Sequence, residues 1–110
     1  MKYELTDKTV EVFGHTLRRI RYLETGGLGG WIESEKNLSQ DGNARVSGDA
    51  RVYGDTQVYG DARVSGDARV SGNALVYGDA EVSGNARVCG NAEVSGNAEV
   101  CGIAGGRRTN

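Results

Sequence analysis

Residues 42–101 read GNARVS GDARVY GDTQVY GDARVS GDARVS GNALVY GDAEVS GNARVC GNAEVS GNAEVC, which is one six-residue phrase written ten times. The slots hold Gly, then Asn or Asp, then Ala, a variable residue, Val, and finally Ser, Tyr or Cys. The Val slot never varies, and the Ala slot changes once, at Thr56. A short fixed period of this kind indicates a repeat protein whose units pack on their neighbours.

The spacing within the phrase predicts a short strand followed by a corner. Ala and Val are two residues apart, so on an extended strand they point to the same side and the flanking slots point outward. Gly adopts positive φ freely, and Asn and Asp tolerate turns well, so the Gly-Asn/Asp pair predicts the corner. Three phrases, or 18 residues, close a triangular coil. Successive coils then stack as parallel strands about 4.8 Å apart around an Ala/Val core.

Residues 1–29 do not follow the period and are expected to form a separate N-terminal segment. The β-rich runs 9–13 and 16–23 flank Gly14-His15, which predicts a hairpin with His15 in its turn. Residues 2–5 are a candidate third strand, and residues 25–30 (TGGLGG) are expected to form a flexible turn.

The solenoid is expected to span residues 30–106, and residues 107–110 to form a tail. Counting back by six from Ala44 places Leu38 and Ile32 in the Ala slot of two degenerate phrases, which makes twelve phrases or four coils. We expect Trp31, Ile32 and Leu38 to plug the first coil, because a solenoid needs a capping unit.

The leader LGGWIESEKNLSQ (residues 28–40), followed by GNARV-type phrases, resembles a group of small phage and prophage proteins of bacteria. The phrase also resembles the signature of known hexapeptide solenoids. This resemblance implies an all-β fold, a left-handed parallel β-helix of about four triangular coils with an N-terminal β-hairpin. The handedness rests on the resemblance alone and departs from the general preference for right-handed crossovers. Such proteins are often labelled transferases or polymer-forming proteins on the fold alone, and fold does not establish activity.

Composition limits the types of partner and the cellular location that we expect for this chain. The net charge of −2 argues against direct nucleic-acid binding. The sequence has no apolar run long enough to span a membrane and no signal peptide, so we expect no membrane contact. Cys89 and Cys101 fall on different faces, which argues against a disulfide and fits the reducing cytoplasm of a bacterial host.

Residues 18 apart should stack on one outward face, and two of the three faces are candidate binding surfaces. On the second face, three arginines lie in register, and like charges placed opposite one another are unfavourable. Either Asp49 and Asp67 offset them, or the strip accepts an acidic partner or a phosphate. On the third face, stacked tyrosines indicate either an interface or a stabilising cross-strand pair. The candidate partner-binding residues are Arg51, Arg69, Arg87, Tyr53, Tyr59, Tyr77 and Leu75.

The first face and the C-terminal end carry further expectations. Arg63 should stack over Glu81, which predicts an exposed ion pair on a solvated face that contributes little to stability. The sequence after the last phrase offers no bulky cap, and an uncovered coil invites pairing with another chain. We therefore expect a homodimer formed through Val100, Cys101 and Ile103.

The pattern does not favour catalysis. Hexapeptide acyltransferases use a solenoid His as a base, whereas the one His here, His15, precedes the repeats. The corner Asp and Asn residues are interpreted as turn formers rather than calcium ligands, so no catalytic residue, cofactor or metal is expected. The favoured interpretation is a phage or prophage protein that binds a bacterial host protein, for example to inhibit a defence system such as CRISPR. The alternative is a self-assembling structural solenoid, and an acyltransferase-like enzyme ranks below both.

Overall fold

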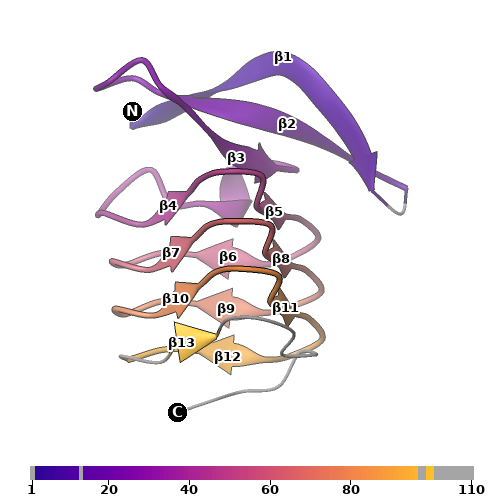
Figure 1. The fold of residues 1–110 in the computed structure, drawn as a ribbon, viewed down its shortest axis with the longest axis vertical. Coiled ribbons are helices and arrows are strands. Elements are labelled where there is room, and N and C mark those ends of the chain that lie inside the picture. The colour runs from indigo at the N-terminus through magenta and orange to yellow at the C-terminus, as the bar shows by residue number, and fades with distance from the viewer. Residues whose placement is uncertain (1, 13, 97–98, 101–110) are drawn as a thin grey trace.

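In the computed structural model, which describes residues 2–12, 14–96 and 99–100, a long β-hairpin lies across one end of a stack of triangular coils (Figure 1). The hairpin is β1 (Tyr3–Val12) and β2 (His15–Tyr22), and β3 (Leu28–Ile32) leads from it into the coils. One turn of 3-10 helix, η1 (Glu35–Asn37), is the only helical element in these described ranges.

Each side of a coil is a two-residue strand formed by the variable residue and the Val of one phrase. These strands are β4 (Arg45–Val46), β5 (Arg51–Val52), β6 (Gln57–Val58), β7 (Arg63–Val64), β8 (Arg69–Val70), β9 (Leu75–Val76), β10 (Glu81–Val82), β11 (Arg87–Val88), β12 (Glu93–Val94) and β13 (Glu99–Val100).

The strands assemble into three sheets, one on each side of the triangle. Their orders are β1-β2-β3-β5-β8-β11, β4-β7-β10-β13 and β6-β9-β12. The coil strands pair in parallel with an offset of 18 residues, as in Val52 with Val70. The expected all-β solenoid of about four coils is therefore confirmed, and its left-handed sense stays a prediction.

The core follows from the inward slots of the phrase. The Val side chains from Val46 to Val94 are buried, as are the Ala side chains from Ala44 to Ala86. Thr56, the one exception in the Ala slot, is also buried, and its hydroxyl donates to the carbonyl of Gly72 at 3.4 Å. A hydroxyl is tolerated there because a backbone acceptor lies within reach.

The corner glycines hold the coils at close range. From Gly42 to Gly96 every corner glycine has φ between 62° and 76°. A Cβ built on Gly72 would lie 2.8 Å from the amide nitrogen of Gly90 in the next coil. A side chain at this slot would therefore face both an unfavourable φ and a backbone with no room to move.

The leader joins the coils in a different phase from the one predicted. Ile32 pairs with Val52 and Leu38 with Val58, an offset of 20 residues rather than 18. Ile32 and Leu38 therefore occupy Val slots, not Ala slots, because two extra residues precede the first regular corner. Gly30 stands in the Ala slot, where a Cβ would lie 2.6 Å from Cγ1 of Val46. Large aliphatic residues fit only the roomier Val slot.

The hairpin also differs from the sequence-based prediction. Residues 3–5 belong to the single long strand β1 and form no third strand. His15 pairs with Val12 as the first residue of β2, so it does not lie in the turn. The expected flexible turn is shorter, since β3 begins at Leu28.

The hairpin supplies the cap for the first coil. Tyr3, Ile20 and Tyr22 are buried in the same cluster as the Ala and Val side chains. The Tyr22 hydroxyl accepts from the amide of Val46 at 2.9 Å and donates to its carbonyl at 3.1 Å. These two hydrogen bonds satisfy the amide and the carbonyl of Val46, which would otherwise need a further coil to pair with. Ile32 and Leu38 are buried as expected, but Trp31 is only partly buried and points outside the coil.

One buried amide joins the leader to the next coil. The Oδ1 atom of Asn37 accepts from the amides of Glu33 and Ser34 at 3.0 and 2.9 Å. Its Nδ2 atom donates to the carbonyls of Gly54 and Thr56 at 3.1 and 2.9 Å. The Asn37 side chain thus makes four hydrogen bonds at full burial, in the pattern that only an amide offers.

We expect Gly72→Ala to destabilise the protein by about 3 kcal/mol, because it adds a backbone clash to the strain of positive φ. Gly14→Ala is the matched control, since Gly14 has φ 83° but, its two chain neighbours aside, no atom of the described residues lies within 4 Å of the position that its Cβ would take. That variant should lose only about 1 kcal/mol. Urea unfolding of both variants measures the difference, and equal losses would show that the corner contact contributes nothing.

We expect Asn37→Asp to lower the free energy of unfolding by about 3 kcal/mol, because a carboxylate cannot donate to the two carbonyls. Asn73→Asp is the control, since Asn73 is exposed and, in the described part of the chain, its Nδ2 atom donates to Asn91 alone, at 3.3 Å. Several regular corners already carry Asp at this slot. Thermal and urea unfolding should therefore separate the two variants clearly.

Candidate functional site

The side of the stack formed by β5, β8 and β11 carries three parallel columns of outward residues, which we call the arginine face. The middle column is Arg51, Arg69 and Arg87, the column before it is Asp49, Asp67 and Asn85, and the column after it is Tyr53, Ser71 and Cys89. A groove of about 580 Å³ runs between the first two columns. The predicted register of the three arginines is confirmed.

The guanidinium groups of the arginine column have no ion-pair or hydrogen-bond partner among the residues that the structure describes. The Nε atom of Arg51 is buried and likewise lacks a partner there. Asp49, one of the two carboxylates expected to offset the column, instead lies 3.7 Å from Arg19 of the hairpin. Within the described ranges, the arginine column therefore presents positive charge that no neighbouring side chain pairs.

Arg19 of the hairpin lies next to Asp49, one of the residues that line this groove. Its Nε donates to the carbonyl of Gly29 at 2.8 Å, and its guanidinium lies 5.3 Å from the centre of the Trp31 ring. Arg18 and Arg21 are exposed, on a strand that lies between β1 and β3 rather than at an edge. The alternation of residue types along β2 does not by itself reveal that Arg19, and not Arg18 or Arg21, lies against the coils.

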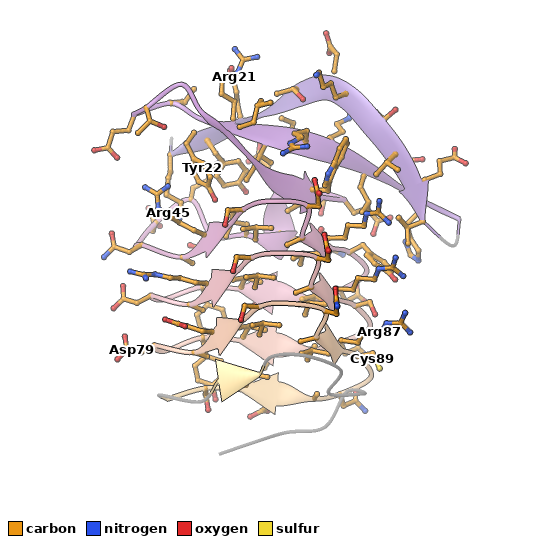
Figure 2. The ribbon with its side chains drawn as sticks, in the orientation of Figure 1. Arg21, Tyr22, Arg45, Asp79, Arg87 and Cys89 are labelled. Atoms are coloured by element: carbon orange, nitrogen blue, oxygen red, sulfur yellow. The ribbon has the colours of Figure 1, made fainter. Side chains whose placement is uncertain are left out.

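Tyr53 is largely buried, whereas the repeat pattern predicted an exposed side chain, and its binding role stays a prediction. Only 7% of it is exposed, and it packs with Val12 and Leu17 of the hairpin. The hairpin folds over this part of the face, which the repeat pattern alone could not show. A second groove of about 210 Å³ begins at Tyr53 and continues between Arg69, Arg87 and Cys89. Figure 2 shows Arg87 and Cys89 close together on the outside of the coils.

The third face, on β6, β9 and β12, contains the expected tyrosine pair. The rings of Tyr59 and Tyr77 stack with centres 5.0 Å apart and planes 5° apart. Burial is the main cause that raises the pKa of Tyr59, and the nearby Tyr77 and Glu93 act in the same direction. The Tyr77 hydroxyl lies 3.5 Å from Glu93, and Leu75 is partly exposed beside it. The stabilising cross-strand pair is present, and a binding role for Tyr59, Tyr77 and Leu75 stays a prediction.

The first face, on β4, β7, β10 and β13, holds a groove of about 550 Å³ lined by side chains of both charges. Strand register brings Arg63 opposite Glu81 as predicted. Among the described ion pairs, however, none joins these two side chains. The guanidinium of Arg45 instead lies 4.7 Å from the centre of the Tyr22 ring, and the two lie together beneath the hairpin in Figure 2.

A small polar hollow of about 370 Å³ was missed by sequence analysis. His15 Nδ1 lies 3.0 Å from Glu33 Oε2, and Glu33 Oε1 accepts from the amide of Gly54 at 2.8 Å. Since an ionised carboxylate can only accept, Nδ1 of His15 is the donor. The hydrogen bond from His15 is the main cause that lowers the pKa of Glu33. Burial acts in the opposite direction and raises this pKa, and the hydrogen bond from the Gly54 amide lowers it further. Only the hairpin's position on the coils brings these groups together.

The remaining expectations concern metal binding, membrane contact and self-association. Over the described residues, no three His, Cys, Asp or Glu side chains gather as a metal site, and no helix is long and apolar enough to cross a membrane. Of the predicted self-association residues, Val100 lies in β13, whereas Cys101 and Ile103 lie outside the described residues.

The lowered pKa of Glu33 predicts a loss of stability in acid. Its carboxylate stabilises the fold above its ordinary pKa of 4.5, and this contribution disappears as the pH falls through the lower folded value. Glu33→Gln should therefore be less stable than the wild type at pH 7. The gap between the two urea midpoints should narrow by pH 3, and a gap independent of pH would contradict the assignment.

Comparison with known proteins agrees with this architecture. A family model described as the YdcK beta solenoid repeat matches residues 44–60, 56–71 and 68–84, which span β4 to β10. A search of curated proteins gives no match. The matched repeats and the stacked parallel coils together show that the chain is a β-solenoid repeat protein.

Proposed function

We propose that this chain is a non-catalytic binding module that holds an acidic surface of another protein on its arginine face. The observation that carries the proposal is the arginine column, whose guanidinium groups have no ionic partner among the described residues. In line with the resemblance of its leader, we propose a protein of a bacterial host as the partner, in the cytoplasm. An inhibitor of a defence system such as CRISPR is one form of this proposal.

The energetics of the column favour an anionic partner. Arg51, Arg69 and Arg87 are in register on adjacent strands, so their charges repel one another in the free protein. A partner that supplies carboxylates relieves this repulsion and forms charge-assisted hydrogen bonds. The column stands on the paired strands β5, β8 and β11, so we expect binding to require little ordering of the main chain. These features support selectivity for an acidic surface.

Self-assembly through the C-terminal end is the second candidate function. β13 is the outer strand of its sheet, next to β10. An outer strand of a solenoid offers backbone groups to another chain. In this alternative, Val100, Cys101 and Ile103 join two subunits, and the dimer is a structural unit that needs no other protein.

The proposal is tested by capture from a bacterial host lysate with the triple variant R51E/R69E/R87E. The matched control is R18E/R21E/R63E, which makes the same charge change at three exposed arginines away from the column. We expect wild type and control to retain one host protein at near-equal stoichiometry in low salt, and the column variant to lose it.

Two outcomes would contradict this function. Equal capture by all three proteins would place the contact elsewhere on the chain. Recovery of the bait alone, with a mass that rises with concentration in sedimentation experiments, would favour self-assembly instead. Raising the salt concentration should weaken true capture, because exposed charges are screened.

A further inference from the structure

We infer that the segment held by the arginine face is an α-helix with one acidic stripe, lying along the axis of the coil stack. This inference rests on the proposed function and adds the shape of the partner. It is drawn from the spacing of the arginine column and from the residues on either side of it.

The column has a fixed repeat along the stack. Arg51 pairs with Arg69, and Arg69 with Arg87, on neighbouring parallel strands. Such strands lie about 4.8 Å apart, so the two outer arginines are separated by about 10 Å at the backbone. A partner must place three acidic groups at a matching interval to contact all three arginines at once.

An α-helix meets this interval. Residues i, i+4 and i+7 lie on one face and span about 10.5 Å along the axis. An extended strand places alternate side chains about 6.8 Å apart, so three of them span about 13.6 Å. The mismatch over three contacts is about 1 Å for a helix and about 4 Å for a strand, by the same geometry. The column therefore fits a helix much better than a strand.

The neighbouring columns argue against a uniformly negative ligand. Asp49 and Asp67 line the groove beside the arginines, and both are exposed. A polyanion such as a nucleic acid would place phosphates against these carboxylates. A helix can instead carry basic or neutral residues next to its acidic stripe. Asn85 replaces Asp beside Arg87, so the attraction is strongest at the lower end of the column.

The ends of the column limit the length of the contact. Above Arg51 the next residue in register is Trp31, with the Arg19 guanidinium over its ring. The hairpin therefore bounds the face at that end, as Figure 1 shows for β1 and β2. About two turns of helix fit between this boundary and Arg87, since each turn rises about 5.4 Å.

The inference is tested with three fluorescent peptides of identical Glu and Lys content. The first is a side-chain-stapled helix with Glu at i, i+4 and i+7. The second is a helix stapled in the same way, with its Glu residues spread around the axis. The third has the order of the first but is unstapled, and two of its Ala residues are replaced by Pro so that it stays extended; its Glu and Lys content is unchanged. Fluorescence anisotropy at low salt measures each dissociation constant with wild type, R69E and the control R63E.

We expect the striped helix to bind wild type at least tenfold more tightly than either other peptide. R69E should weaken that binding at least tenfold, and R63E should leave it unchanged. R63E carries the same charge change at the same strand position on a different face. Circular dichroism of each variant confirms that the fold is intact.

Other outcomes separate the inference from the proposed function. If all three peptides bind equally and R69E weakens each, an acidic partner is supported and the helix is wrong. If a twelve-nucleotide single-stranded DNA binds more tightly than the striped peptide, the partner is not a protein helix. If R69E changes no binding, and lysate capture is also insensitive to the arginine column, both proposals are overturned.

Discussion

The close approach of successive backbones at the corners is the constraint on which the rest of the structure depends. Each corner glycine has positive φ, and successive corners lie in contact, as Gly72 lies against Gly90. This contact keeps every coil at the same size and the same height. Residues 18 positions apart are therefore forced into register, whatever their charge. The arginine column is a product of this constraint, since no local attraction places three like charges together.

The N-terminal hairpin both caps the core and covers part of the arginine face. It covers the open end of the core with Tyr3, Ile20 and Tyr22, and the Tyr22 hydroxyl satisfies both backbone groups of Val46. It also reaches over the arginine face, where it buries Tyr53 and brings Arg19 to Asp49. The cap thus decides how much of the repeat surface stays open, and it leaves the lower part of the arginine column exposed.

The periodic part of this fold could be predicted from the sequence, because every phrase repeats the same local chemistry. The inward Ala and Val slots, the glycine corners and the stack of Tyr59 on Tyr77 all follow from counting by 6 and 18. The leader could not be predicted in the same way. Two extra residues shift Ile32 and Leu38 into the Val slot, and counting back by six from the regular phrases cannot detect this shift. The positions of Tyr53, Trp31 and His15 depend on how the hairpin lies on the coils, which is a tertiary contact between unrelated patterns.

The triangular cross-section also sets a rule for how such a gene can change in length. Insertion of a single phrase would leave the corners and the core intact, yet it would rotate every later residue to the next face. Arg87 would then leave the column of Arg51 and Arg69 without any loss of packing. Only a gain or loss of three phrases at a time preserves the identity of each face. Duplication of one six-residue phrase is therefore neutral for folding, whereas only duplication of a whole 18-residue coil is also neutral for recognition by a partner.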